Sequence, residues 1–169
     1  MVKRFARKEI LKRLNKTIRE GRPIVAAGSS AGIIAKCAEL GGADLIMVYS
    51  SGRERLRGLQ TNIVENSNEE TLKMFEEIQN VVQDTPIIGG IHATESPGSD
   101  LAEMVKRFID TGFSGIINFP AFGFFDDKNW RSEKETQGIG FSREIELIRV
   151  AMIWVYSPWP TFFTLQMLG

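Results

Sequence analysis

The sequence predicts an α/β domain in which about four parallel strands are covered by helices and preceded by an amphipathic helix. Apolar runs and helical patterns alternate four times along the chain, as they do in parallel sheets whose strands are joined by helices. The apolar runs are continuous rather than alternating, which is typical of strands buried on both faces. Each run ends in glycine or small polar residues, and parallel α/β folds bind ligands at that end of their strands.

Composition agrees with one folded domain. The chain has 169 residues, of which 43% are hydrophobic and 25% charged, which excludes disordered and collagen-like chains. A single cysteine, Cys37, cannot form an internal disulfide and gives no sign of an oxidising compartment. No apolar run reaches the roughly 18–20 residues of a membrane span, and the start is charged. We therefore expect a cytoplasmic protein with no membrane partner.

Residues 1–22 are strongly basic. They hold nine basic and two acidic side chains, a net charge of +7, although the whole chain, with 21 of each sign, is neutral. Such a segment can serve as a nucleic-acid-binding arm or as an organellar transit peptide. We favour an amphipathic helix with a solvated basic face, and no nucleic-acid partner, because no aromatic platforms interleave with the charges and the apolar residues recur at helical spacing. The apolar residues are Phe5, Ile10, Leu11, Leu14 and Ile18.

The later elements follow in order. Residues 23–28 form the first apolar run, and a helix over 32–40 closes on Gly41 and Gly42, because glycine accepts the left-handed conformation of a helix end. Residues 44–50 form the second run, and a helix over 68–83 carries an apolar face and begins at residues that can cap it. The third run covers 86–92, a helix from Leu101 ends at Gly112, the fourth run covers 114–120, and a helix covers 141–151.

Candidate ligand-binding residues follow the first two runs. Gly28, Ser29, Ser30 and Gly32 lie in a loop that enters a helix, where backbone N–H groups and hydroxyls can bind an anion; the alternative is an ordinary turn. Ser51, Gly52 and Arg53 follow the second run, and a guanidinium can bind a carboxylate or phosphate in bidentate fashion. The alternative for Arg53 is a surface arginine beside Arg55 and Arg57.

Candidate catalytic residues follow the third and fourth runs. His92 is the only histidine and lies close to Thr94 and Glu95, so His92 and Glu95 are candidates for proton transfer. Asn118 ends the fourth run and is followed by a loop with Phe122, Phe124 and Phe125, which we expect to form a lid or core. Glu95 and the carboxylates of Asp126 and Asp127 could hold Mg²⁺, whereas zinc-ligand spacing is absent from the sequence.

These segments together resemble the TIM-barrel phosphoenolpyruvate-hydrolase-like family of the phosphoenolpyruvate/pyruvate superfamily. The stretches that carry the resemblance are RKEILKRL, PIVAAGSSAGIIAKCAELGGADLIMVYSSGR, DTPIIGGIHAT, GFSGIINFPAFGFFD and ETQGIGFSREIELIRVA, from about residue 4 to residue 151. The resemblance implies the N-terminal half of a (β/α)8 barrel, a fold of about 250 residues. The loops at Gly28, Ser50 and His92 depart from the family pattern, and superfamily analogy implies Mg²⁺ as the cofactor.

The resemblance divides the chain into a partial barrel domain, 1–151, and a tail, 152–169, outside the family pattern. The tail is uncharged and aromatic. One legal codon set for it, with a base inserted after the Met152 codon, reads MDLGLFTLAYVF, so we expect a truncated or frameshifted gene product. The alternative is a short tail that supplies a fifth strand or a partner surface. An open half-barrel leaves unpaired strand edges, which favours a homo-oligomer formed through those edges or the tail.

The resemblance also implies a function. Family chemistry acts on phosphoenolpyruvate-like compounds or small 2-oxo acids, as a hydrolase or lyase, through an enolate-like state that needs anion stabilisation. The donors at residues 28–32 and Arg53 would supply it, His92 or Glu95 would transfer the proton, and the truncated chain itself is expected to be inactive. The alternative is a regulatory module that binds a small anionic metabolite or a partner without turnover.

Overall fold

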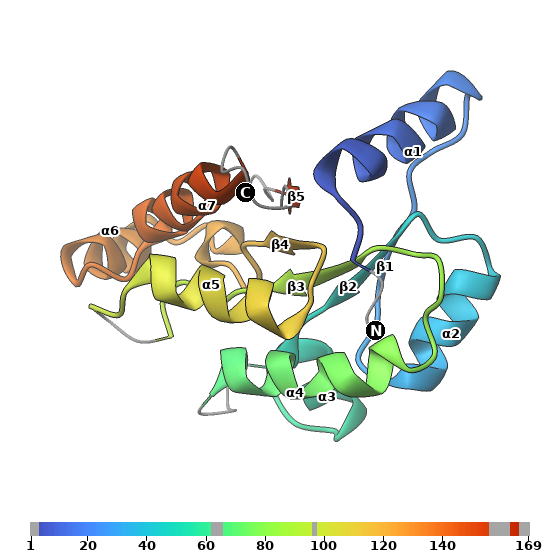
Figure 1. Cartoon of the computed structure of the whole chain (residues 1–169). Coiled ribbons are helices and arrows are strands. Elements are labelled where there is room, and N and C mark those ends of the chain that lie inside the picture. Colours follow the sequence, from blue (N-terminus) through green and yellow to red (C-terminus); the bar gives the residue numbers. More distant parts are fainter. Residues whose placement is uncertain (1–3, 62–65, 96–97, 156–162, 166–169) are drawn as a thin grey trace.

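One parallel sheet organises the molecule. The computed structural model describes residues 4–61, 66–95, 98–155 and 163–165. Its strands are β1 (Ala26–Gly28), β2 (Leu45–Val48), β3 (Ile87–Gly90), β4 (Gly115–Ile117) and β5 (Phe163–Leu165), which lie side by side in sequence order (Figure 1). Every neighbouring pair is parallel, with Ala27 opposite Ile46 and Gly89 opposite Ile116. The described helices are α1 (Arg7–Arg19), α2 (Gly32–Leu40), α3 (Ser50–Leu56), α4 (Ser67–Gln79), α5 (Leu101–Thr111), α6 (Lys128–Thr136), α7 (Phe141–Val155) and the short 3-10 turn η1 (Phe122–Phe124).

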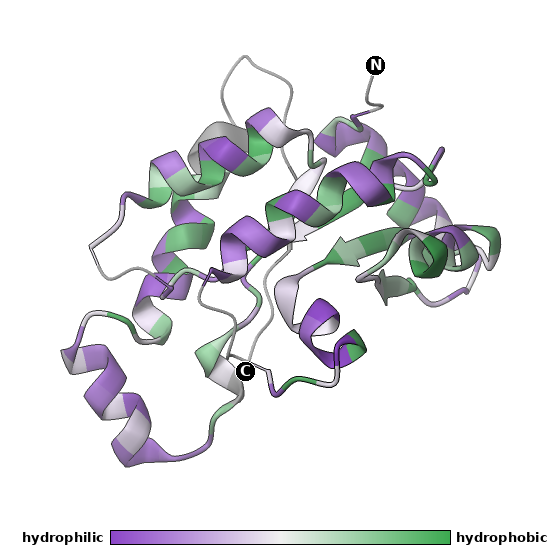
Figure 2. Cartoon of the chain, turned by 90° about the horizontal axis from the view of Figure 1, so that it is seen from below, coloured by the Kyte–Doolittle hydropathy of each residue, from purple (hydrophilic) through white to green (hydrophobic). Residues whose placement is uncertain are grey.

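Helices cover the outer face of the sheet and form the larger core. The strands contribute the side chains that alternate toward this face, such as Ile46, Val48 and Ile116, all fully buried. The helices contribute one apolar stripe each, and Phe75 of α4 and Phe108 of α5 pack on Phe113. In Figure 2 the helices carry hydrophilic and hydrophobic stripes while the central strands are hydrophobic. This pattern confirms the predicted α/β architecture.

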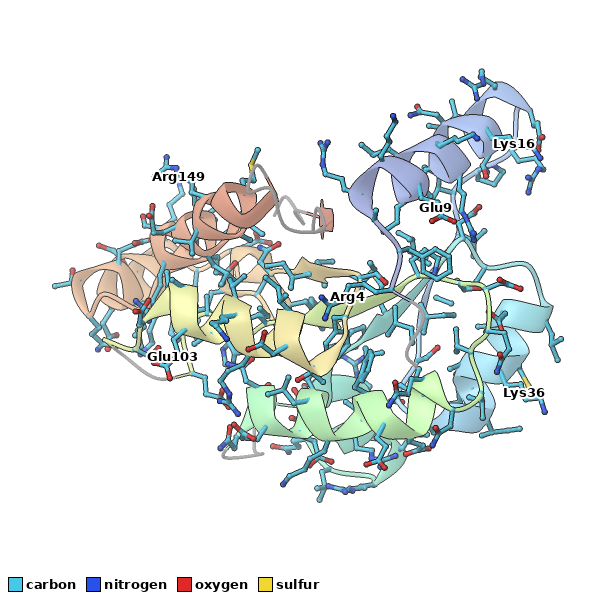
Figure 3. The ribbon with its side chains drawn as sticks, in the orientation of Figure 1. Arg4, Glu9, Lys16, Lys36, Glu103 and Arg149 are labelled. Carbon is cyan, nitrogen blue, oxygen red and sulfur yellow. The ribbon has the colours of Figure 1, made fainter. Side chains whose placement is uncertain are left out.

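The inner face of the same strands is covered by α1. Phe5, Ile10 and Leu14 form a second buried cluster with Leu45, Ile88 and Ile117, and α1 lies across the sheet from α2 and α4 (Figure 1). The basic side chains of α1 stay outside, as Lys16 does in Figure 3, where Lys36 of α2 and Arg149 of α7 also point into solvent. The predicted solvated basic face of α1 is therefore confirmed.

Most expected elements are present within a few residues of their predicted bounds, and three helical segments are additional. The sequence analysis expected no helix at α3, η1 or α6. Helix α6 has the sequence KNWRSEKET and no buried residue, so it lacks the apolar period that identifies a helix. Helix α3 is only seven residues long and contains Gly52.

The predicted division at residue 151 falls within a helix. Helix α7 continues through Ala151 to Val155, and residues 163–165 pair with β4 as a fifth strand, with Gly115 opposite Phe163. Most of the remaining tail lies outside the described residues. At the opposite edge of the sheet, Ile24 and Val25 before β1 are 41% and 49% exposed. No helix in the described parts of the chain is both long and apolar enough to cross a membrane.

Candidate functional site at the carboxyl ends of the strands

The parallel order brings all four predicted clusters to one edge of the sheet. Because β1 to β4 are parallel neighbours, their carboxyl ends share this edge. Tyr49, directly after β2, fills the space between two glycines. A Cβ atom on Gly28 would lie 2.3 Å from the Tyr49 hydroxyl oxygen, and one on Gly90 would lie 2.8 Å from Tyr49 Cβ. The Tyr49 ring packs edge-on against Phe119, with 4.6 Å between ring centroids.

Arg53 meets the Gly-Ser loop but is bound by carboxylates of α4. Its Nη1 donates to the Ser30 carbonyl oxygen at 3.1 Å, its Nη2 donates to Glu77 Oε2 at 3.1 Å, and its Nε lies 3.7 Å from Glu70 Oε1. The Gly32 N–H donates to the other Glu77 oxygen at 2.7 Å. This amide and Arg53 lower the pKa of Glu77. The side chain of Glu77 thus lies where the sequence predicted an anionic ligand.

Asn68 bonds to both His92 and Glu95, which are also joined directly by the Glu95 N–H and the His92 carbonyl oxygen at 3.4 Å. Asn68 Oδ1 accepts the His92 N–H at 2.8 Å, and its Nδ2 donates to the His92 carbonyl oxygen at 3.1 Å. The Glu95 carboxylate accepts the Asn68 N–H at the start of α4, where the helix dipole favours negative charge. Burial nevertheless raises the pKa of Glu95. Asn68, which is 5% exposed, was expected only as a possible cap of this helix, and its link to His92 and Glu95 was not predicted.

The His92 ring has a hydroxyl partner. Its Nε2 lies 2.8 Å from Thr94 Oγ1, and the ring packs edge-on against Phe122 at 5.8 Å. Burial lowers the pKa of His92, so the imidazole is neutral at pH 7. A neutral imidazole can accept a proton, which is the chemistry expected of this residue.

Asn118 leads to a buried acid that the sequence analysis did not single out. Asn118 is 1% exposed, and its Nδ2 donates to Glu144 Oε2 at 3.3 Å. The Phe122 N–H donates to the other oxygen, Oε1, at 2.5 Å. Glu144 is itself 1% exposed, and burial raises its pKa to about 7. A signal was present, because Glu144 occupies the apolar stripe of α7, three positions from both Phe141 and Leu147.

A small cavity opens at this edge between α3 and the segment after β4, and we call it the strand-end cavity. It has a volume of about 150 Å³ and is lined by Ser51, Arg55, Thr61, Phe119, Pro120, Ala121, Phe122 and Phe125. Ser51 is 2% exposed and its hydroxyl has no hydrogen-bond partner among the described residues. A buried hydroxyl without a partner costs free energy, so a ligand oxygen at this position would be favoured.

Helical spacing explains which arginine lines the strand-end cavity. Ser51 and Arg55 are four residues apart on α3 and therefore share a face. Arg53 and Arg57 lie on another face, and both pair with Glu70 of α4, at 3.7 and 3.2 Å. No ion pair is recorded for Arg55 within the described parts of the chain. Of the residues predicted to bind substrate, only Ser51 lines the cavity; Arg55, expected to be a solvated side chain, is exposed as well as lining it.

A larger hollow, of about 260 Å³, lies between α4 and α5. Several of its polar groups already have partners: Asn66 and Asp100 cap the two helices, and Glu69 pairs with Arg107. Glu95, on the α4 amide, also lines it. A site whose donors and acceptors are satisfied offers a ligand less than the unpaired Ser51 hydroxyl does. We therefore assign the candidate site to the strand-end cavity.

The described residues do not fit a Mg²⁺ site. Nowhere in residues 4–61, 66–95, 98–155 and 163–165 do three acidic, histidine or cysteine side chains gather. Glu95 faces amides of α4, and Asp127 caps α6 through the N–H groups of Asn129 and Trp130. Oxygen ligands of Mg²⁺ must be free to coordinate it, and these two carboxylates already accept hydrogen bonds from backbone N–H groups.

Comparison with known proteins gives the same fold. The phosphoenolpyruvate hydrolase-like family model matches residues 9–154. The ToMV resistance protein Tm-1(GCR237) of Solanum lycopersicum is 38% identical over 146 residues, which are 84% of this chain and 19% of that protein. This chain thus spans about a fifth of the length of that relative.

Two solved structures are similar in fold. A phosphoenolpyruvate phosphomutase of Streptomyces platensis has a TM-score of 0.60 at 19% identity, covering 92% of this chain and 52% of the other. A phosphonopyruvate hydrolase, solved with oxalate and Mg²⁺, has a TM-score of 0.52 at 18% identity, covering 94% and 63%. The predicted half of a TIM barrel is confirmed, since the chain matches about half of such barrels.

Proposed function

Because the chain belongs to the phosphoenolpyruvate hydrolase-like family, we propose that it binds a small anion of the phosphoenolpyruvate or 2-oxo acid class in the strand-end cavity. In this proposal the chain supplies the anion-binding part of a barrel that carries out hydrolase or lyase chemistry. The observation that carries it is the buried, unpartnered hydroxyl of Ser51 beside Arg55 on the same face of α3. A hydroxyl donor and a guanidinium are the groups that recognise carboxylate and phosphate oxygens.

The same groups would stabilise an enolate-like state. Negative charge that develops on a ligand oxygen is stabilised by donors that are already in position, and the stabilisation is greater where water is excluded. Phe119, Phe122 and Phe125 supply apolar walls to the cavity. His92, which packs on Phe122, is the proton-transfer residue of this proposal, and Glu95 supports His92 through Asn68.

A second candidate function is binding without turnover. It is favoured by one observation: neither His92 nor Glu95 is among the residues that line the strand-end cavity. In that case the half-barrel recognises a small anionic metabolite without converting it. The two candidates differ in whether phosphate or pyruvate is released when the chain is mixed with phosphoenolpyruvate.

The binding proposal predicts that Arg55→Ala lowers the affinity for oxalate, phosphoenolpyruvate or phosphate about tenfold or more. A hydrogen bond to a charged group contributes about 1.5–3 kcal/mol, which corresponds to this change. Isothermal titration of each anion into the purified chain measures it, and Ser51→Ala is expected to act in the same direction.

Arg57→Ala is the matched control, because Arg57 directly follows α3 as its C-cap residue and pairs with Glu70 outside the cavity. Its affinity should equal that of the unsubstituted chain. If Arg53→Ala weakens binding while Arg55→Ala does not, the ligand lies at the Gly-Ser loop and the strand-end cavity is the wrong site. If anions bind normally but no product forms, the binding module is favoured over the enzyme.

A further inference from the structure

Glu144 connects α7 to the wall of the strand-end cavity. Its carboxylate is 1% exposed and accepts hydrogen bonds from Asn118 Nδ2 and the Phe122 N–H. Asn118 directly follows β4, while Phe122 begins η1 and lines the cavity. Two separate parts of the cavity-forming segment are therefore held by one side chain from a distant helix.

The contacts of Phe122 extend this connection. The Phe122 ring packs edge-on against His92 at 5.8 Å and against Trp130 at 5.0 Å, and Trp130 packs on Phe125 at 4.6 Å. A shift of the Phe122 backbone would therefore move one wall of the cavity. Through the ring contacts it would also reach His92, the proposed proton-transfer residue, and Trp130, which packs on the cavity residue Phe125. Packed side chains transmit such shifts because protein interiors leave few voids.

We propose that Glu144 is a positioning residue whose carboxyl group, through its charge, sets the location of Phe122 and Asn118 at the strand-end cavity. The ionised form accepts at both oxygens, and uptake of one proton turns one acceptor into a donor. Neither Asn118 Nδ2 nor the Phe122 N–H can accept that proton, so one of the two bonds must weaken. The proposal rests on the proposed function only in taking the cavity as the ligand site.

The charges around Glu144 are few. Glu135 on α6 raises its pKa and Arg131 on the same helix lowers it, but burial is the largest cause of the rise to about 7. On α7 itself, Arg143 is bonded to the carbonyl oxygens of Ala93 and Ser99. The His92 ring packs against the ring of Phe122, the residue whose N–H is bonded to Glu144. Geometry and charge thus agree that the carboxyl changes its bonding near neutral pH.

Trp130 reports this change without any ligand. In a chain whose other two tryptophans are replaced by phenylalanine (Trp154→Phe and Trp159→Phe), the emission of Trp130 should change with a midpoint of about pH 7. Glu144→Gln, which cannot ionise, should abolish the transition and hold the emission at its acidic value. Glu146→Gln is the matched control, because Glu146 is exposed on the same helix and pairs with Arg149; the transition should be unchanged.

Two further measurements decide between Glu144 and its neighbours. His92→Asn should keep the transition, whereas its loss in this variant would assign it to the imidazole and overturn the proposal. In the chain labelled with ¹³C at glutamate carboxyls, one resonance should titrate together with the Trp130 signal; the absence of such a resonance overturns the proposal even if Glu144→Gln does not fold. Failure of anion binding would instead count against the proposed function alone.

Discussion

Gly90→Ala is expected to lower the free energy of unfolding by about 1–3 kcal/mol, the usual cost of forcing an extra methyl group into a packed interior. A Cβ atom at this position would lie 2.6 Å from the Phe119 carbonyl oxygen and 2.8 Å from Tyr49 Cβ. Both neighbours are backbone or backbone-proximal atoms, so neither can move without shifting a strand end. Urea unfolding of the two chains measures the difference in unfolding free energy, provided that this free energy falls with urea concentration at the same slope in both.

Gly28→Ala is the matched control for this clash. Its Cβ atom would meet the hydroxyl end of Tyr49 at 2.3 Å, and the far end of a side chain can tilt away by a change of χ1 without a shift of the backbone. We therefore expect a smaller loss than for Gly90→Ala. Replacing glycine by alanine without strain usually stabilises a chain by about 0.4–1 kcal/mol, so a stabilised Gly90→Ala variant would contradict the packing described for Tyr49.

Asn68→Ala is expected to cost about 2–4 kcal/mol of unfolding free energy. The substitution leaves the His92 N–H without its acceptor and removes one of the two donors to the His92 carbonyl oxygen, which keeps the Glu95 N–H. A buried backbone group that loses its partner costs about 1–3 kcal/mol, and a lost hydrogen bond costs about 0.5–1.5 kcal/mol. Thermal unfolding measures the loss, and the chemical shift of the His92 amide in an ¹⁵N-labelled sample reports the displaced loop.

Asn66→Ala provides the comparison on the same helix. Asn66 is the N-cap of α4 and accepts the Glu69 N–H, so its loss should cost about 1 kcal/mol and leave the His92 amide unshifted. If both variants lose the same stability and neither moves the His92 signal, Asn68 acts as a helix-capping residue only.

The main elements of the fold were predictable because each carries its own local signal. The continuous apolar runs at 44–50 and 86–92 contain β2 and β3, and the helix predicted over 32–40 matches α2. Helix α6 was missed because none of its residues is buried. A fifth strand from the tail was only the alternative expectation, because the position of residues 163–165 is set by the free edge of β4.

The site was predictable only in part, because its ionic partners are set by helix packing. Glu77 lies 45 positions from Gly32 and 24 positions from Arg53 in the sequence. A local sequence pattern gives no information about contacts between residues so far apart in the chain. Arg53 does reach the Gly-Ser loop as predicted, at the Ser30 carbonyl oxygen, but its place on a different face of α3 from Arg55 could not be seen because α3 was not predicted. Glu144 was also not predicted, although a carboxylate within an apolar stripe is visible in the sequence.

The position of α1 also affects how the chain acquires its structure. The Phe5 N–H donates to Ser114 Oγ across 109 positions, and the inner-face cluster joins Phe5 and Ile10 to Ile117. At 5–20 residues per second, roughly 5–20 s of synthesis separate these partners. Helix α1 is therefore synthesised well before its partners, and its apolar stripe stays uncovered during that time. Repulsion between the positive charges of residues 1–22 keeps such unfinished chains apart.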